Sequence, residues 1–274
     1  MSLEVRELGT EHDAALRGLL SVDALRNLRL LDAWEETSMG PSRHYGLFSA
    51  QRLLAAALVE PSSGRIWPSA CAPHHARALG TSLAGTVVLR SSLGDRPAVE
   101  ALVDTLRPSK PRLIAHRLFT ASPDNLGPFT SRALRLANED DGPRLVQMNA
   151  AELAESFDGD PPAEGAEVLE ARVLHHIRRR RTWVLELGGS LATKVEVGAQ
   201  TRFGAELEGV YTVPEHRFCG CATLALGQLS RNLLSSTPQL TLRIADSAEG
   251  LLAVARKVGY VGGSVPQLLA IAYA

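Results

Sequence analysis

The sequence predicts a mixed α/β fold built as two tandem domains, and three observations lead to this prediction. The chain has 274 residues, which is long for one average domain but suits two cores of about 140 residues each. A stretch rich in Pro, Gly, Asp and Asn, ASPDNLGPFT, separates two apolar runs. Each half also opens with a short strand, continues through helical segments and reaches a strand pair. We therefore predict domains at 1–120 and 131–274 joined by a linker at 121–130.

The elements of the first half follow from alternating apolar residues and turn signals. A strand is expected at the start, then two strands joined by a tight turn, then a strand followed by a helix. These segments are residues 3–8, 45–48, 53–59, 66–71 and 74–83. The junction Ala72-Pro73-His74-His75 has no glycine, so a phosphate could not approach this backbone closely. The first domain is therefore predicted to keep the sheet and to lack a cofactor loop.

The second half repeats this order and adds a helical stripe and a capped helix. Gly188-Gly189 is the expected turn between its two paired strands, and Gly259 is the expected C-terminal cap of its last helix. The predicted strands and helices are residues 133–137, 182–187, 191–197, a strand reaching Pro214, a helix from Ala222 to Leu233, a strand at 240–244 and a helix at 248–258.

The junction between that strand and helix is the most informative segment. A β-branched strand ends at Pro214 and runs through Arg217-x-x-Gly220-x-Ala222 directly into the helix. The first turn of a helix leaves backbone N–H groups unpaired and carries about half a positive charge. Because Gly220 and Ala222 leave the backbone bare, a phosphate could bind there.

This segment resembles the acetyl-CoA pyrophosphate loop of GNAT-type N-acyltransferases, whose signature is Gln/Arg-x-x-Gly-x-Gly/Ala. Over about 140 residues the second half is similar to a bacterial group of two-domain GNAT proteins with a degenerate N-terminal domain. The stretches that carry this are Glu155 to Pro161, Ala171 to Val173, Lys194 to Val197, Glu208 to Tyr211 and Pro214-Glu215-x-Arg217.

The resemblance implies acetyl-CoA or another acyl-CoA as donor, a primary amine on a small molecule or peptide as acceptor, and direct attack without an acyl-enzyme. It also implies that a backbone N–H at Tyr211 to Val213 polarises the donor carbonyl and that pantetheine pairs with this strand edge. The residues expected at the donor site are Tyr211, Thr212, Val213, Arg217, Phe218, Cys219, Gly220, Cys221, Ala222, Thr223 and Asp246.

Some positions depart from the family pattern. Phe218 and Ala222 stand where relatives have glycine, and Asp246 replaces an Asn at the start of the last helix, where it is expected to act as the cap. Ala255 stands where relatives often have the Tyr that protonates the departing thiolate. Another acid or water would have to do this, or the reaction is slow or lost.

An ammonium must lose a proton before it attacks a thioester, so a base is needed. Glu206 and Glu208 lie two apart on the strand before the loop, which places both side chains on one face. Either is a candidate base, and either could instead be a solvated strand residue. Glu196, Asp158 and Asp160 are the alternatives, and the loop at 155–165 is where the family places acceptor selectivity.

Composition excludes several classes of function. The net charge of −1 argues against a general nucleic-acid binder, and the Arg178 to Arg181 run is interpreted as a solvated helix end. Cys219-x-Cys221 lacks the spacing of zinc sites, so no metal is expected. The three cysteines, and the lack of a signal-like or membrane-spanning apolar run, favour the cytoplasm and no membrane partner. A homodimer is left open.

The function favoured by the sequence is acetyl transfer from acetyl-CoA to a primary amine by the second domain. A catalytically impaired acyl-CoA-binding or scaffold protein is the main alternative, because Ala255 is not an acid and one domain lacks the loop. An RNA-associated module that uses the Arg run is a weaker third class.

Overall fold

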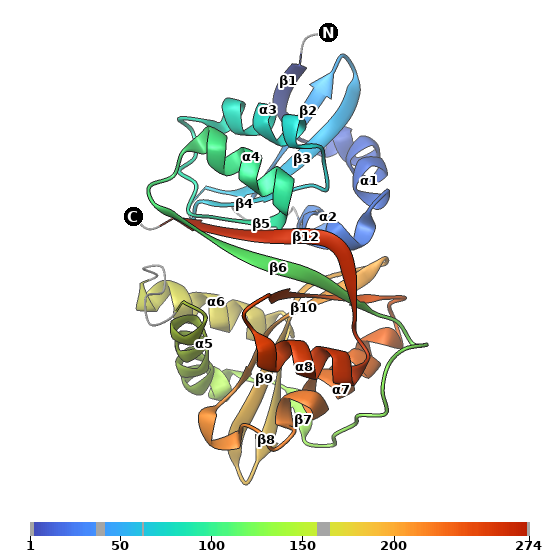
Figure 1. The fold of residues 1–274 in the computed structure, drawn as a ribbon, viewed down its shortest axis with the longest axis vertical. Helices are drawn as coiled ribbons and strands as arrows, with labels where there is room; N and C mark the ends of the chain where they lie inside the picture. Colours follow the sequence, from blue (N-terminus) through green and yellow to red (C-terminus); the bar gives the residue numbers. More distant parts are fainter. Residues whose placement is uncertain (1–2, 37–41, 62, 158–164, 273–274) are drawn as a thin grey trace. The chain divides into compact units, whose positions relative to one another are not determined.

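A computed structural model describes residues 3–36, 42–61, 63–157 and 165–272 (Figure 1). The chain forms two compact units. Unit 1 comprises Met1–Leu118, Ala199–Phe203 and Gly263–Ala274, and unit 2 comprises Phe119–Gly198 and Gly204–Gly262. Helices and strands alternate in both, so the predicted mixed α/β class is confirmed. No helix among the described residues is both long and apolar enough to cross a bilayer.

Unit 1 is a mostly antiparallel sheet with helices on both faces. Its strand order is β1-β2-β3-β4-β5-β12-β6, and β4 and β5 are parallel. The elements from the first part of the chain are β1 (Leu3–Glu7), α1 (Asp13–Ser21), α2 (Leu28–Glu35), β2 (Arg43–Ser49), β3 (Arg52–Glu60), β4 (Arg65–Pro68), α3 (Pro73–Leu83), β5 (Ser91–Asp95), α4 (Arg96–Leu106) and β6 (Pro111–Ala121).

Alternate buried residues of β3 point to opposite faces of this sheet, and both sets are apolar, so helices cover both faces. Ala55, Ala57 and Val59 lie in one buried cluster with residues of α3 and α4. Ala56 and Leu58 lie in another with residues of α1 and α2. Successive strand residues point to opposite faces, so an uninterrupted apolar strand requires a helical layer on each side.

The buried His44 of β2 should make unit 1 sensitive to acid. Its ring is 2% exposed, its Nε2 lies 3.2 Å from the Leu30 carbonyl oxygen, and Trp34 packs edge-on at 5.0 Å. Burial lowers the pKa of His44 to about 4, although the hydrogen bond to Leu30 opposes this shift. The unfolded chain takes up the proton near pH 6.5, so this stability is fully present above pH 6.5 and is lost as the pH falls toward 4.

We expect the wild-type protein to lose roughly 3 kcal/mol of unfolding free energy from His44 between pH 7 and pH 4. Urea unfolding at both pH values measures it. His44→Gln, which has no titratable ring, should lose less over the same interval. An equal loss in both proteins would show that other groups cause the acid sensitivity.

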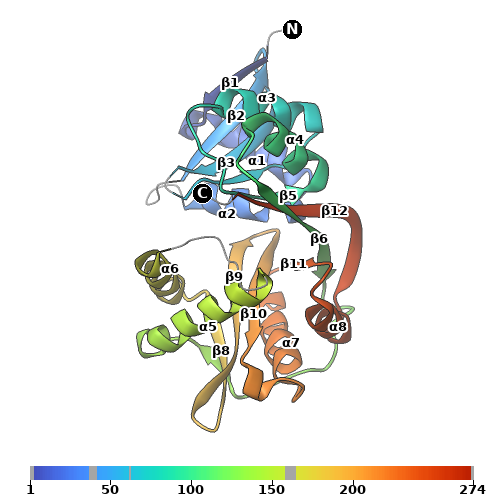
Figure 2. The same cartoon turned by 60° about the vertical axis from the view of Figure 1, so that its left-hand side comes forward.

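Unit 2 has the same design (Figure 2). Its strand order is β11-β10-β9-β8-β7, with β10 and β11 parallel, and the end of β6 lies beside β11. Its elements are β7 (Leu134–Leu136), α5 (Gly142–Ser156), α6 (Ala166–Arg178), β8 (Thr182–Leu187), β9 (Ser190–Thr201), β10 (Gly204–Thr212), α7 (Cys221–Leu234), β11 (Leu240–Ala245), α8 (Glu249–Val258) and the start of β12 (Val261–Ala272).

The two faces of the unit 2 sheet are covered by different helix pairs. Leu240, Leu242 and Ile244 of β11 share a buried cluster with α7 and α8. Tyr211 and Val213, at the end of β10, share another with α5 and α6. The apolar alternation predicted at 240–244 is therefore confirmed, with the apolar side against α7 and α8. The polar alternate positions of the same strand, Thr241 and Arg243, lie on the opposite face of the sheet.

Both halves of the chain follow the order strand, two helices, three strands, helix, strand, helix, strand. The internal repeat expected from the sequence is thus present. The last strand is exchanged, however: β12 pairs antiparallel with β5 of unit 1, from Gln267 opposite Asp95 to Ile271 opposite Ser91. A division of the sequence at one linker does not describe this pairing, because residues 263–272 belong to unit 1.

Turn and cap residues behave as their chemistry requires. Gly188 and Gly189 have φ of +56° and +79° between β8 and β9, as a two-residue hairpin turn needs. Gly259 has φ of +114° at the C-cap of α8. Both predictions are confirmed.

Candidate functional site

The junction between β10 and α7 forms an open helix N-terminus. Gly220 is the N-cap residue of α7 with φ of +81°, and it is exposed. A Cβ added there would meet no atom within 4 Å. The N–H groups of the first helical turn are therefore accessible to an anion, and the geometry fits a phosphate group.

The neighbours of Gly220 differ in accessibility. Phe218 is fully exposed and has φ of +61°, and Cys219 is exposed. Cys221 and Thr223 are buried at the start of α7, and burial raises the pKa of the Cys221 thiol. Ala222 is half-buried. The accessible rim of this turn therefore consists of residues 218–220.

Arg217 is held by the protein itself. Its guanidinium donates to both carboxylate oxygens of Glu155, at 2.7 and 2.8 Å, and its Nε donates to the Thr212 carbonyl at 3.0 Å. The Tyr211 hydroxyl donates to the same carboxylate at 3.0 Å, and the Arg217 charge lies 5.5 Å from the Tyr211 ring. The hydrogen bonds that Arg217 donates to Glu155 raise the pKa of Arg217. Arg217 thus fastens the loop to the end of α5.

Strands β10 and β11 separate before they end. Their paired register covers only Ala205–Leu207 and Leu240–Leu242, whereas β10 continues to Thr212 and β11 to Ala245. The β10 edge beyond Leu207 is therefore not paired with β11. A backbone edge of this kind can pair with an extended ligand.

The alternation of side chains along β10 shifts by one residue at Gly209, and this slip determines which backbone amides face the unpaired edge. Leu207 and Val210 both pack against the α7 and α8 cluster, while Tyr211 packs against α5 and α6. In a regular strand residues 207, 209 and 211 would share a face. Gly209, with φ of +59°, takes up the extra residue, as in a β-bulge.

The direction of the backbone amides at the end of β10 bears on which N–H could polarise the donor carbonyl. Val213 N–H donates to the Ala192 carbonyl at 3.0 Å, so it is already used on the β9 side. Because amide directions alternate along a strand, Tyr211 N–H points to β9 as well. The amides of Val210 and Thr212 then point to the opposite edge, where β11 has separated. Of the expected range Tyr211 to Val213, this leaves the Thr212 N–H at the open edge, because pairing with β9 continues one residue beyond β10 and uses the Val213 N–H.

The two candidate bases have different surroundings. Glu206 is 2% exposed and forms an ion pair with Arg243 on β11. Glu208 is half-buried and lies with His176 of α6 and Glu196 of β9, whose ligand atoms all lie within 4.8 Å of one another. Glu206 is therefore neutralised inside the sheet, whereas Glu208 lies in a polar group of titratable side chains.

Lys194 of β9 is at the centre of this group and is fully buried. Its Nζ lies 2.7 Å from Glu152, 3.0 Å from Glu196 and 3.1 Å from the Gly209 carbonyl oxygen. Burial alone would lower the pKa of Lys194, but the charges of Glu152 and Glu196 outweigh burial and raise it. Burial likewise disfavours ionised Glu196, yet Lys194 and His176 leave its pKa lowered.

His176, Glu196 and Glu208 are the group of possible metal ligands found among the described residues. The Lys194 ammonium lies 3.0 Å from Glu196 and supplies a positive charge at that carboxylate. Asp158 and Asp160, the other predicted acids, lie outside the described residues. At the end of α6, Arg178 pairs with Glu139 at 2.9 Å and Arg181 donates to the Gly198 carbonyl, as a helix end held by local contacts would.

The last helix carries two of the departures from the family pattern. The N-cap position of α8 is taken by Ala248, and Asp246 lies two residues earlier in a turn. The expected cap was displaced because β11 extends to Ala245. Ala255 is fully buried in the core of unit 2, so no acid is available at that position. Tyr260 is also buried, with its hydroxyl 2.8 Å from Ser230 Oγ.

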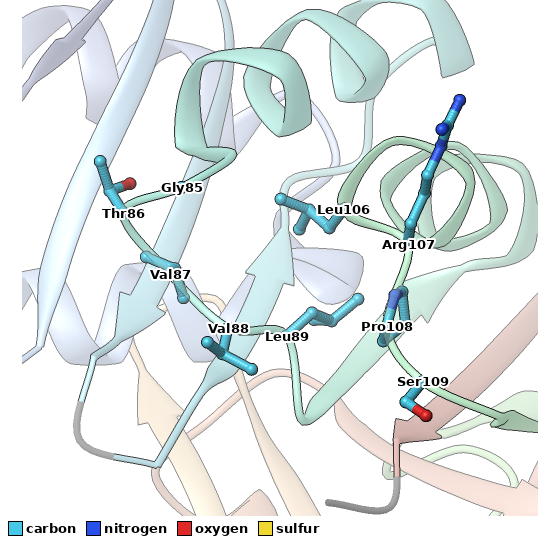
Figure 3. A pocket seen from close by; sticks show the side chains of 9 residues that line it. All are labelled: Gly85, Thr86, Val87, Val88, Leu89, Leu106, Arg107, Pro108 and Ser109. Atoms are coloured by element: carbon cyan, nitrogen blue, oxygen red, sulfur yellow. The ribbon is translucent and has the colours of Figure 1, made fainter.

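A separate hollow of about 340 Å³ lies in unit 1 between the end of α3 and the end of α4. Leu89, Leu106 and Pro108 line it, while the Arg107 side chain points away (Figure 3). It contains none of the predicted site residues. The open helix end and strand edge of unit 2 therefore remain the candidate site.

Sequence reasoning missed Lys194, Glu152 and His176 as site residues, and it named Glu155 only as part of the 155–165 loop, without its pairing to Arg217 and Tyr211. Only Lys194 left a signal: it interrupts the run Ala192-Thr193-Lys194-Val195, in which a charged residue is out of place for a strand covered on both faces. Glu196 lies two residues from Lys194 on the same strand, but the other two partners, Glu152 of α5 and Gly209 of the slipped strand, could not be read from spacing.

Comparisons with known proteins agree with this architecture. A Drosophila protein solved as a structural-genomics target superposes with a TM-score of 0.69 at 14% identity, covering 97% of this chain and 98% of that chain. A GCN5-related N-acetyltransferase from Sphaerobacter thermophilus gives 0.60 at 13% identity, with 98% and 94% covered. A tandem GNAT protein from the clavulanic acid biosynthesis pathway gives 0.57 at 14% identity, with 98% of each chain covered.

No protein-family model matches the chain, and no curated protein matches it by sequence. At these low identities the structural likeness establishes the fold. The chain has the fold of GNAT acetyltransferases in the tandem arrangement that the sequence predicts.

Proposed function

We propose that unit 2 is an N-acyltransferase that moves an acetyl or similar acyl group from acyl-CoA to a primary amine. The observation that carries this proposal is the separation of β10 from β11 directly before the open N-terminus of α7. An extended, phosphate-bearing thioester needs both a free strand edge and an anion site in line with it. We propose one donor site per chain, because the matching junction of unit 1 has Ala72 as N-cap and Pro73, which has no N–H.

The donor would bind with its pyrophosphate at the α7 N-terminus and its pantetheine arm along β10. Residues 218–220 are the accessible rim of the phosphate site. Cys221, Ala222 and Thr223 supply first-turn N–H groups, and Arg217 keeps the loop in place through Glu155. The Val210 N–H is the donor best placed to bind the thioester carbonyl oxygen.

The chemistry follows from these positions. Glu208 takes a proton from the acceptor ammonium, and the neutral nitrogen attacks the thioester carbon. As the C–N bond forms and the C–S bond breaks, the nitrogen releases its second proton and the CoA sulfur takes one up. Ala255 cannot provide that proton, so we propose that water carries it. Glu206 is left out of this role because Arg243 neutralises it.

We expect Glu208→Gln to lower the acylation rate by about 10²-fold near neutral pH, since the amide keeps the shape but cannot accept the proton. The affinity for acetyl-CoA should stay unchanged. Raising the pH deprotonates the amine in solution and should partly restore the variant relative to wild type. The measurement is turnover of acetyl-CoA with a panel of primary amines across pH.

Glu206→Gln is the matched control. It breaks the buried pair with Arg243, so it should lower stability without producing the pH-dependent rate loss. Full activity of Glu208→Gln at every pH would assign the base elsewhere, with Glu196 next.

The second candidate function is an acyl-CoA-binding protein without catalysis. The buried Ala255, in the place of an acid, favours it. Binding of acetyl-CoA without turnover of any amine would support this alternative. Turnover would exclude it.

A further inference from the structure

We infer that Lys194 is a positioning residue that aims the Val210 N–H at the thioester carbonyl of the donor. It does so by holding the carbonyl of the preceding peptide group. The inference rests on the proposed acyltransferase function of unit 2 and concerns a residue that never touches substrate.

The ammonium of Lys194 has three N–H donors, and it has three acceptors. They come from three elements: Glu152 on α5, Glu196 on β9, and the Gly209 carbonyl on β10. The side chain is fully buried, so water does not compete for these bonds. A buried cation is costly unless all its partners are in place, so the three groups are held together as a unit.

The bond to Gly209 acts on the slipped part of β10. Gly209 O and Val210 N–H belong to one planar trans peptide group, in which the C=O and N–H point in opposite directions. Lys194 Nζ lies 2.7 Å from Glu152 of α5, so it holds this oxygen from the side of the sheet that α5 covers, and the Val210 N–H points away from that side. The alternation counted back from Val213 directs the Val210 N–H toward the edge that β11 has left.

The contact between Lys194 and Gly209 leaves no room for a side chain at position 209. An added Cβ would lie 2.9 Å from Lys194 Nζ and 3.1 Å from Glu196 Cδ, and φ is +59°. The ammonium therefore approaches a glycine that no larger residue could replace without movement. When the Gly209 carbonyl accepts a hydrogen bond from a cation, the Val210 N–H of the same peptide group becomes a better donor, because linked hydrogen bonds polarise one another.

The peptide group lies between the two proposed chemical functions. Glu208, the proposed base, immediately precedes Gly209, and Val210, the proposed carbonyl donor, immediately follows it. A rigid Gly209 therefore sets the separation of base and carbonyl donor. Positioning of this kind affects the transition state more than donor binding.

The test uses the full chain with acetyl-CoA labelled with ¹³C at the carbonyl. A hydrogen bond from Val210 lowers the infrared C=O frequency of the bound donor relative to free acetyl-CoA. The first variant is Lys194→Met combined with Glu152→Gln, which removes the cation and one carboxylate together, so that the buried charge stays balanced. Glu152→Gln alone is the matched control, since its amide oxygen can still accept a hydrogen bond from Lys194 and the bonds of Lys194 to Glu196 and Gly209 remain.

We expect the double variant to lose at least about 10-fold in kcat with KM for acetyl-CoA within about threefold, and its C=O band to return toward the solution value. Glu152→Gln alone should keep both the band and kcat. Gly209→Ala, which retains every charge and displaces the contact, should behave like the double variant. It provides the same readout if the double variant does not fold.

An unshifted band in wild type that binds acetyl-CoA, or a shifted band retained in a folded double variant or in Gly209→Ala, would overturn the inference and leave the acyltransferase proposal standing. Wild type that neither binds nor consumes acetyl-CoA would overturn both. A purely structural role of Lys194 would lower stability and leave the band in place.

Discussion

Gly220→Glu should abolish detectable acetyl-CoA binding, a loss of more than about 10³-fold, because the new carboxylate would lie where the donor phosphates bind. The site is open, since a Cβ at Gly220 meets nothing within 4 Å, so the side chain can be accommodated. The φ of +81° adds a cost of about 1–2 kcal/mol, which a stable domain tolerates. Calorimetry gives both affinity and stoichiometry, and wild type should saturate at one acetyl-CoA per chain.

Two variants separate charge from backbone strain in this test. Gly220→Ala carries the same φ cost without the charge and should bind much more tightly than Gly220→Glu. Gly85→Glu places the same residue at φ of +82°, also in open space, but in unit 1. It should bind normally. Unchanged affinity in a folded Gly220→Glu protein would contradict the donor site.

Leu268→Asp should unfold unit 1 or bring it close to unfolding, because β12 completes its sheet. Leu268 is 2% exposed and packs with Ala270 and Val99 of α4. An unpaired charge buried there costs roughly 4 kcal/mol or more, a large part of the stability of a typical domain. Hydrogen exchange of β2 and β3 should show lost protection, and the fluorescence of Trp34 and Trp67 should shift toward that of solvated indole.

Val261→Asp is the control for the same strand. Val261 is 57% exposed, so a carboxylate there stays hydrated and stability should change by less than about 0.5 kcal/mol. Full protection of β2 and β3 in Leu268→Asp would mean that β5 does not depend on β12. The pairing also bears on truncation: a chain that starts near Thr130 would keep β12 but lose β5, its partner.

Local chemistry was sufficient for much of the fold. Alternation in residues 182–187 and 240–244 predicted strands because a covered sheet imposes a period of two. Gly188-Gly189 and Gly259 marked a turn and a cap because only glycine takes positive φ at little cost. Gly220 marked the open helix end for the same reason. These signals need no information from distant residues.

The partners of the charged residues at the site could be identified only from the tertiary structure. Glu206 and Glu208 are equivalent in sequence, two residues apart on one strand face. Arg243 distinguishes them by pairing with Glu206, and no spacing rule connects residues 206 and 243. Similarly, the slip at Gly209 and the use of the Val213 N–H by Ala192 both depend on the neighbouring strand β9 as well as on the residues of β10.

The sequence by itself determined the tandem α/β fold, the repeat and the Gly220 helix end, because each depends on period, turn chemistry or backbone freedom within a few residues. Only the tertiary structure decided that β12 completes unit 1, that Lys194 is buried among Glu152, Glu196 and Gly209, and that Glu206 is neutralised. Strand pairing and ion pairing are contacts between residues far apart in the chain. Their energies depend on which surfaces meet and how much water is excluded, and neither quantity is present in a local pattern.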